Sequence, residues 1–261
     1  MQIGIMTYIN CKHADVREQF EMFKKLGVHR TFLSGGHPRL GEVMELLPKY
    51  DIICDNFHSE FDGAVIGKNI SMGDLRFKSD AGDLMLERLF FNVLNCEKYR
   101  VPILVVHSPY GDPKNAFNEI SDERYIRLGD FAREHGVTLA FENISHYENL
   151  EHTLSLIPDS KFCWDIGHQH CFGDRKKVMP SFGHRLAALH IHDNNLENDD
   201  HMIPFEGKIN FDEAAKELAD SGYEGTLMLE LLYKGQLPTE EYYTKAANAA
   251  KKLVDMVASY K

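Results

Sequence analysis

The chain has 261 residues, of which 43% are hydrophobic and 26% are charged, a balance typical of a globular protein with a large core. Its 29 Lys and Arg residues and 40 Asp and Glu residues give a formal net charge of -11, which argues against nucleic acid as a partner. No apolar run approaches the roughly 20 residues of a membrane-spanning helix and no signal peptide is indicated, so we expect no membrane association.

Short apolar runs rich in β-branched residues alternate along the whole chain with amphipathic stretches. Eight runs have the length and composition of strands: Gln2–Thr7, Arg30–Ser34, Asp51–Phe57, Val101–His107, Val137–Glu142, Lys161–Ile166, Leu186–Asp193 and Gly225–Leu231. Seven stretches have helical spacing: Asp15–Leu26, Glu42–Pro48, Ala81–Lys98, Asp122–His135, Leu150–Ile157, Phe211–Ser221 and Glu240–Tyr260. After the sixth strand the helical pattern is weaker and lies around Phe172–Ser181.

These strands show little polar alternation, which is typical of parallel strands that are covered on both faces. Eight strand–helix units in regular order favour a closed (β/α)8 TIM barrel over an open sheet, and we expect one domain over residues 1–261. Neither a GxGxxG motif nor a P-loop motif occurs, so a dinucleotide fold has no local support.

The five cysteines are odd in number and no two have CxxC spacing. Buried, reduced thiols explain them best, because disulfides and zinc sites use paired cysteines. We therefore expect a cytoplasmic protein.

Acidic residues and histidines gather where the predicted strands end. Six of the eight strands end in or beside such residues: His58, His107, Glu142, Asp165 with His168, His190 with His192 and Asp193, and Glu230. The carboxyl ends of the strands of a TIM barrel meet on one face, which carries the active site. A single residue of this kind could be a helix cap, but capping does not readily explain six strand ends.

Carboxylates that converge in a barrel mouth repel one another unless a cation lies between them. Two glutamates, an aspartate and a histidine form a hard, oxygen-rich ligand set. We expect one divalent metal ion, with Mn2+ favoured and Mg2+, Co2+ or Zn2+ as alternatives. His58 and His107 could bind a second metal, contact a substrate or be structural, and we favour contact with substrate. We interpret seven further histidines as surface residues: His13, His29, His37, His135, His146, His152 and His184.

Several sequence blocks resemble the xylose isomerase-like barrels, and more narrowly the sugar phosphate isomerase/epimerase group. The blocks are Phe141-Glu142-Asn143, Trp164-Asp165-Ile166-Gly167-His168, His190-Ile191-His192-Asp193-Asn194, Asp199–Gly207 and Leu229-Glu230. The resemblance implies that Glu142, Asp165, His190 and Glu230 bind the metal. It also implies that Glu142 and Glu230 are the catalytic acid and base.

The same resemblance points to substrate contacts at His168 and at Glu148. To these we add five more candidates at the strand ends and in the Asp199–Gly207 block: His58, His107, His192, Asp199 and His201. Ketose epimerases of this group have an arginine six residues after the histidine ligand, and here that position is Leu196. The resemblance therefore points to the group as a whole more than to ketose 3-epimerases.

Apurinic endonucleases are a second resemblance, because His58, His107, Asp199 and His201 match positions of their additional metal ligands. The segment after the third strand differs from theirs, however, and no basic face is indicated.

We therefore expect a metal-dependent isomerase or epimerase of a small sugar or sugar derivative. It would remove a proton beside a metal-chelated carbonyl and proceed through an enediolate. The alternatives are a lyase or dehydratase acting on an inosose-type keto-polyol, an endonuclease-like metal hydrolase, and an inactive carbohydrate-binding barrel. The expected partner is a small carbohydrate, and a homo-oligomer is possible.

Overall fold

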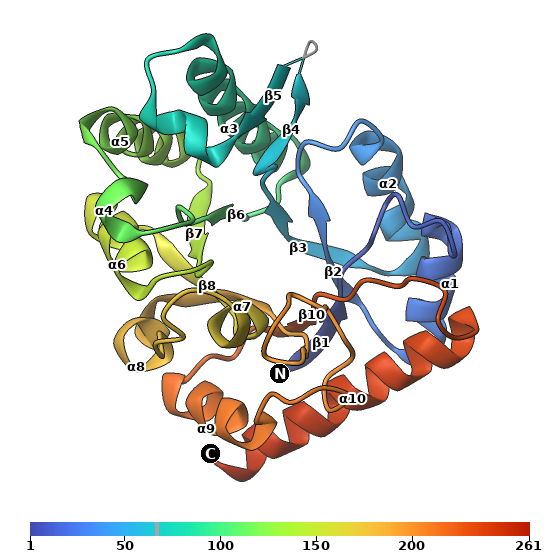
Figure 1. Cartoon of the computed structure of the whole chain (residues 1–261). Helices are drawn as coiled ribbons and strands as arrows, with labels where there is room; N and C mark the ends of the chain where they lie inside the picture. The colour runs from blue at the N-terminus through green and yellow to red at the C-terminus, as the bar shows by residue number, and fades with distance from the viewer. Residues whose placement is uncertain (66–67) are drawn as a thin grey trace.

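Eight parallel strands form a nearly closed barrel in the computed structural model, which describes residues 1–65 and 68–261 (Figure 1). The strands are β1 (Gln2–Ile5), β2 (Arg30–Ser34), β3 (Ile53–His58), β6 (Ile103–His107), β7 (Thr138–Glu142), β8 (Lys161–Asp165), β9 (Leu186–His190) and β10 (Thr226–Leu229). They are hydrogen-bonded in the order β10-β1-β2-β3-β6-β7-β8-β9. A parallel bridge between Ile191 and Leu229 joins the two ends of this sheet. The (β/α)8 TIM-barrel prediction is confirmed.

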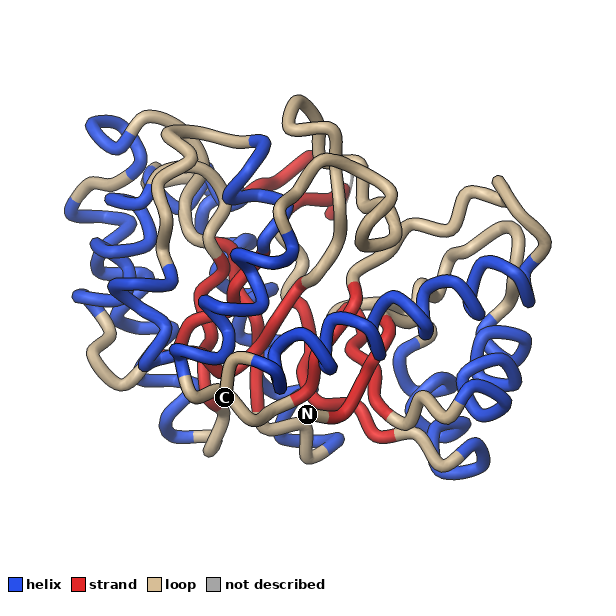
Figure 2. The backbone as a smooth tube through the Cα atoms, turned by 90° about the horizontal axis from the view of Figure 1, so that it is seen from below, coloured by secondary structure: helices blue, strands red, loops and turns tan. Residues whose placement is uncertain are grey.

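Helices surround the strands, which occupy the middle of the molecule (Figure 2). The helices are α1 (Val16–Leu26), α2 (Leu40–Leu46), α3 (Asp80–Tyr99), α4 (Pro113–Ala116), α5 (Glu119–Glu134), α6 (Tyr147–Leu156), α7 (Ile166–Cys171), α8 (Met179–Phe182), α9 (Phe211–Ser221) and α10 (Thr239–Ser259). Three short 3-10 helices complete the set: η1 (Leu47–Tyr50), η2 (Met72–Arg76) and η3 (Gly183–Arg185). Within the described part of the chain, no helix combines the length and the apolar character required to cross a bilayer.

Local sequence explains where the first helix begins and ends. The Asp15 carboxylate accepts hydrogen bonds from the first-turn amides of α1, and the Glu18 carboxylate accepts one from the amide of Asp15. Gly27 ends the helix with a φ of 72°, a left-handed conformation that glycine adopts without steric cost. Between these caps Phe20 and Phe23 are fully buried, so one face of α1 packs onto the barrel.

The region after β8 differs from the sequence-based prediction. The helix α7 begins directly at the strand end, and the stretch around Phe172–Ser181 contains only the start of the short helix α8. The side chain of Asp165 caps α7 by accepting a hydrogen bond of 2.7 Å from the amide of His168. Periodicity alone could not reveal this because α7 is short.

An antiparallel hairpin was also not predicted. It consists of β4 (Asp62–Val65) and β5 (Lys68–Ser71) and lies between β3 and η2. It follows Phe61 at the carboxyl end of β3, so it stands beside the face where the acidic residues and histidines gather (Figure 1).

Candidate active site

Four side chains from four neighbouring strands converge at the carboxyl end of the barrel. Glu142 ends β7, Asp165 ends β8, His190 ends β9 and Glu230 follows β10. One ligand atom from each lies within 4.8 Å of one atom from every other. Nδ1 of His190 is 3.1 Å from Oε1 of Glu142 and 3.5 Å from Oε2 of Glu230. Glu142, Asp165 and His190 are fully buried, so water cannot screen their charges.

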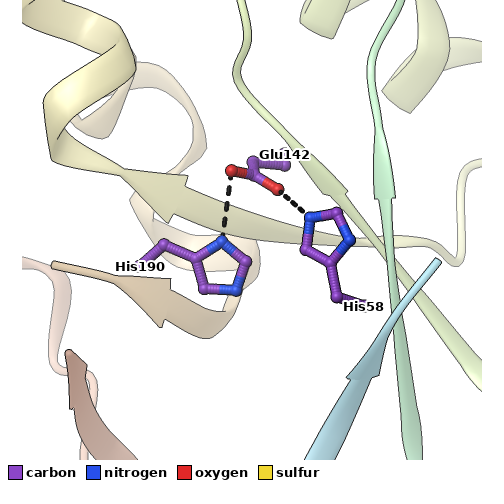
Figure 3. A group of neighbouring side chains, drawn as sticks. All are labelled: His58, Glu142 and His190. Carbon is purple, nitrogen blue, oxygen red and sulfur yellow. Dashed lines mark hydrogen bonds and ion pairs between the residues drawn. The ribbon is translucent and has the colours of Figure 1, made fainter. Parts of the chain in front are cut away.

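Glu142 is surrounded by imidazole rings (Figure 3). Its Oε2 lies 3.1 Å from Nε2 of His58 and 3.6 Å from Nε2 of His107. Its Oε1 lies 3.3 Å from Nδ1 of His168, in addition to the contact with His190. The two Nε2 atoms of His58 and His107 are themselves 3.1 Å apart. Four imidazole rings, which come from the ends of β3, β6 and β9 and from just past β8, therefore contact the carboxylate at the end of β7.

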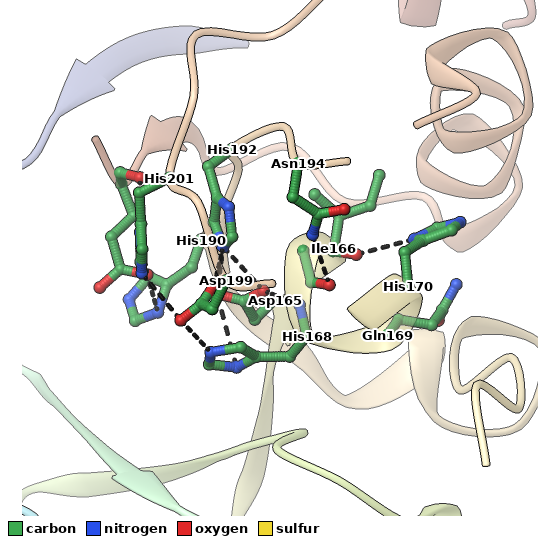
Figure 4. A network of polar contacts seen from close by, with 12 residues as sticks. Asp165, Ile166, His168, Gln169, His170, His190, His192, Asn194, Asp199 and His201 are labelled. Atoms are coloured by element: carbon green, nitrogen blue, oxygen red, sulfur yellow. Dashed lines mark hydrogen bonds and ion pairs between the residues drawn. The ribbon is translucent and has the colours of Figure 1, made fainter. Parts of the chain in front are cut away.

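Asp165 and Asp199 belong to a second part of the same network (Figure 4). Asp165 Oδ1 lies 3.2 Å from Nε2 of His192. Asp199, in the segment after β9, contacts three rings through its carboxylate. Its Oδ2 is 3.0 Å from Nε2 of His201 and 3.3 Å from Nε2 of His168, and its Oδ1 is 3.5 Å from Nε2 of His192.

Two histidines turn a nitrogen lone pair toward a carboxylate if their rings are neutral. Nδ1 of His58 donates to the carbonyl oxygen of Ser59 at 2.7 Å, and Nδ1 of His201 donates to the carbonyl oxygen of Glu230 at 3.0 Å. Because a carbonyl only accepts, Nδ1 carries the hydrogen in both rings. Nε2 of a neutral ring then faces Glu142 or Asp199 with its lone pair. The lone pair and the carboxylate repel each other unless a proton or a metal ion lies between them. Histidines that bind metals commonly donate their other ring N–H to a backbone carbonyl, as His58 and His201 do here.

The pKa values follow from burial and from these neighbours. Burial opposes ionisation of Glu142, but the charge of His190 and the close contacts with the His168 and His190 rings outweigh it and hold the pKa of this carboxyl well below its usual range. Burial lowers the pKa of His107 to about 3, so this ring is neutral at pH 7. Burial opposes protonation of His201, yet its hydrogen bond with Asp199 and the charge of Glu230 raise its pKa to about 9. Glu142 is therefore ionised at neutral pH.

Asn143 fixes the position of Asp165 through two backbone hydrogen bonds. Its Nδ2 donates to the carbonyl oxygen of Asp165 at 2.7 Å, and its Oδ1 accepts from the amide of Asp165 at 2.9 Å. Its own carbonyl oxygen accepts from Nδ1 of His168 at 3.1 Å. Asn143 thus ties the carboxyl end of β8 to that of β7.

Gly167 lets α7 pass close to the cluster. A Cβ atom at this position would lie 1.8 Å from Cε1 of His192. Only glycine permits this approach of α7 to the His192 ring, because the ring is completely buried and has no room to move aside.

A cavity of about 500 Å3, here called the proximal cavity, opens above the cluster. Glu142, Glu230, His58, His107, His168, Asp199 and His201 all line it. His37, Asn10 and Tyr8 line it as well and were missed from the sequence. We expected His37 at the surface, but it is half-buried and its Nε2 is 3.0 Å from Oδ1 of Asn10. These three residues follow β1 and β2, so a wider window after each strand end could have found them.

Glu148 is not placed with the other candidates. It is exposed at the start of α6, beside His146 and Asp174, and does not line the proximal cavity.

At the position where ketose epimerases have an arginine, the carbonyl oxygen of Leu196 accepts a hydrogen bond of 2.8 Å from Nη2 of Arg175.

The family model for the xylose isomerase-like TIM barrel matches residues 88–253. The chain belongs to this family. The match begins in α3 and ends in α10, so it includes all four residues of the converging cluster.

Relatives of the xylose isomerase-like chain include a named epimerase. Fructoselysine 3-epimerase of Escherichia coli is 24% identical over 255 residues, which cover 89% of this chain and 90% of that protein. An uncharacterised protein of Methanocaldococcus jannaschii is 30% identical over 237 residues, covering 84% and 88%. The chain spans half or less of two other relatives. An uncharacterised Sinorhizobium fredii protein is 35% identical over 41% of its length, and another from M. jannaschii is 29% identical over 50% of its length.

Solved structures share the fold at low identity. A D-tagatose 3-epimerase-like protein superposes with a TM-score of 0.74 at 17% identity, covering 99% of both chains. The IolI protein with a bound zinc atom gives a TM-score of 0.73 at 16% identity, covering 100% of this chain and 99% of that one. A putative xylose isomerase of Rhodospirillum rubrum gives 0.76 at 15% identity, covering 98% and 99%.

Proposed function

We propose that this chain is a divalent-metal-dependent isomerase or epimerase of a small sugar or sugar derivative. The observation that carries the proposal is the convergence of Glu142, Asp165, His190 and Glu230, whose ligand atoms lie within 4.8 Å of one another at the carboxyl end of the barrel. Three carboxylates and an imidazole are a donor set for Mn2+, with Mg2+, Co2+ and Zn2+ as alternatives.

Unsatisfied polar atoms support a cation at this cluster. Oε1 of Glu142 and both ring nitrogens of His190 are buried and form no hydrogen bond, although Oε1 of Glu142 and Nδ1 of His190 lie only 3.1 Å apart. Buried polar atoms in proteins are nearly always paired, so such a group calls for a ligand. When bound, the ion would withdraw electrons from a substrate carbonyl and so acidify the neighbouring carbon. Two smaller groups, His58 with Glu142 and His190, and His192 with His201 and Glu230, share members with the first group.

Glu142 and Glu230 are the acid and base in this proposal. They come from β7 and from the residue after β10, so the ends of β8 and β9 lie between them in the barrel. One carboxylate removes a proton from the carbon beside the carbonyl, which gives an enediolate, and the other returns a proton. Return to the neighbouring carbon gives isomerisation, and return to the opposite face of the same carbon gives epimerisation.

Neutral and protonated histidines around the cavity suit the rest of a sugar. His58, His107, His168 and His201 are proposed to hydrogen-bond substrate hydroxyls together with Asp199. His192, which we also expected to contact substrate, is fully buried and does not line the proximal cavity, so we propose that it positions Asp165 and Asp199 instead. The relatives support the substrate class, since fructoselysine 3-epimerase aligns over almost the whole chain. Glu148 has no part in the proposal, because it lies away from the proximal cavity.

Solvent-deuterium uptake tests the proposal directly. The protein, loaded in turn with Mn2+, Mg2+, Co2+ or Zn2+, is incubated in D2O with a panel of ketoses, aldoses and inososes. Mass spectrometry reports deuterium at carbon, and metal analysis gives the number of ions bound. Deuterated isomers or epimers support the proposal, whereas a product that has lost water indicates a dehydratase.

Glu230→Gln tests the role of the acid and base. This change keeps the size of the side chain and removes its charge, so we expect turnover to fall by roughly 100-fold or more. Glu197→Gln, on the loop after β9, is the control for loss of one negative charge and should keep full turnover. Full turnover by the metal-loaded Glu230→Gln enzyme would exclude Glu230 as acid or base.

A further inference from the structure

A second cavity, here called the distal cavity, adjoins the proximal cavity and has a volume of about 340 Å3. His107 and Phe61 line both cavities, and their rings stack with centroids 4.4 Å apart and planes 14° apart. The Nε2 atom of His107 is in turn 3.6 Å from Oε2 of Glu142. One layer of side chains therefore separates the distal cavity from the candidate metal ligands, and a substrate longer than a simple sugar could occupy both.

The charged side chains that line the two cavities differ. The proximal cavity is lined by four acidic side chains, Glu60, Glu142, Asp199 and Glu230, which are paired with Arg88 or with histidines or belong to the candidate metal cluster. The distal cavity is lined by Arg76 and, among the described residues, by no Asp or Glu. Arg76 would thus attract an anionic group to the distal cavity.

Arg76 has no acidic partner. Its Nε donates to the carbonyl oxygen of Gly73 at 3.2 Å and its Nη1 to that of Asn115, and its guanidinium lies over the ring of Phe77. No ion pair joins Arg76 to any other side chain in the part of the chain that the structure describes. Backbone carbonyl oxygens and the Phe77 ring contact this charge, but no carboxylate does, which leaves the guanidinium able to bind an anion.

Two hydroxyl groups on the wall of the distal cavity also lack partners. The side chains of Ser108 and Tyr125 are each only 1% exposed, and neither hydroxyl forms a hydrogen bond with any described residue. A buried hydroxyl that is left unpaired costs free energy, so a ligand atom that pairs with it would be favoured at each position. With Arg76, they give the distal cavity three hydrogen-bond donors and an overall preference for oxygen acceptors.

We propose that the distal cavity binds an anionic group, a carboxylate or a phosphate, at the far end of a substrate whose sugar end lies in the proximal cavity. The identity of the sugar end rests on the proposed function. The preference for an anion rests on Arg76, Ser108 and Tyr125 and does not depend on the reaction. The substrate would then be a sugar that carries an acidic extension.

Matched ligands test the preference for an anionic extension. Fructose joined through carbon 1 to the nitrogen of glycine carries a carboxylate, and its glycinamide counterpart has the same length without that charge. Fructose and fructose 6-phosphate complete the set and distinguish a carboxylate from a phosphate source. Binding to the metal-loaded protein is measured by titration calorimetry, and kcat and KM are measured wherever deuterium uptake shows turnover.

Three variants locate the effect. Arg76→Gln removes the charge, Tyr125→Phe removes only the hydroxyl, and Arg127→Gln changes the net charge equally on the exposed face of α5. We expect the acid to bind about tenfold more tightly than the amide, and Arg76→Gln to abolish this difference, since the variant loses the charged hydrogen-bond donor. Tyr125→Phe should weaken binding of the acid severalfold, while Arg127→Gln should leave it unchanged.

Equal binding of acid and amide, or equal losses in Arg76→Gln and Arg127→Gln, would overturn the proposal. Absence of deuterium uptake with every sugar would instead argue against the isomerase function, while the binding comparison would still decide the role of the distal cavity. Salt screens exposed charges, so an ionic contact with Arg76 predicts weaker binding of the fructose–glycine acid in 0.5 M salt than in 0.05 M salt. Tighter binding in 0.5 M salt would count against this contact.

Discussion

Substitution of Asn143 by alanine should weaken both the fold and the metal site. The side chain makes two hydrogen bonds, of 2.7 and 2.9 Å, with the backbone of Asp165, which is fully buried. Alanine would leave that amide without a partner and would remove one hydrogen bond from that carbonyl oxygen, which belongs to the N-cap residue of α7 and also accepts the first bond of the helix. At roughly 1–2 kcal/mol each, the loss amounts to about 2–4 kcal/mol in the free energy of unfolding. In a chain of this size that lowers the melting temperature by roughly 5–10 °C.

Metal binding should suffer separately, because Asp165 would lose the contacts that orient it. Removal of such a supporting contact typically lowers metal affinity by about 10- to 100-fold. Urea unfolding in EDTA measures the loss in the free energy of unfolding, and titration calorimetry with Mn2+ and Zn2+ measures the loss in metal affinity.

Asn149→Ala is the matched control for Asn143→Ala. Asn149 is equally buried, and its Nδ2 also makes two backbone hydrogen bonds, to the carbonyl oxygens of Pro109 and Gly111. This variant should lose similar stability and keep the metal affinity of the natural protein. If Asn143→Ala binds metal as tightly as Asn149→Ala does, Asn143 does not position the metal ligands. A loss of less than about 0.5 kcal/mol in the free energy of unfolding of Asn143→Ala would refute the estimate from hydrogen bonds.

Two further predictions concern other parts of the core. Burial raises the pKa of the Cys96 thiol to about 12, above its usual value near 9. The neutral buried thiol therefore contributes to stability below pH 9, and this contribution is lost as the pH rises from 9 toward 12. The free energy of unfolding should therefore fall more steeply above pH 9.5 in the natural protein than in Cys96→Ala, by up to about 1.4 kcal/mol per pH unit. Parallel pH profiles of the two proteins from urea unfolding would contradict this expectation. Gly167→Ala should lower stability by about 1–3 kcal/mol and reduce Mn2+ affinity, because the new Cβ would overlap the buried ring of His192. Calorimetric melting and metal titration test this, and an unchanged melting temperature would show that α7 can move aside freely.

The barrel could be predicted because its strands carry their own signal. Apolar runs such as Val101–His107 and Val137–Glu142 contain β6 and β7, and their order along the chain is also their order around the barrel. Parallel strands joined by helices have few other arrangements, so the topology followed from the pattern. The helix α7 and the β4–β5 hairpin could not be predicted, since each is too short to show a period and depends on contacts such as the Asp165 cap.

The sequence by itself determined that Glu142, Asp165, His190 and Glu230 stand at strand ends, and in a parallel barrel all strand ends must meet on one face. Loop residues carry no such constraint, because a loop can turn its side chains inward or outward without changing the pattern of the chain. Only the tertiary structure decided that Glu148 lies outside the cavity and that His37 lies on its wall. It also brought Arg76, from the segment after β5, beside Ser108 and Tyr125, which belong to distant parts of the sequence.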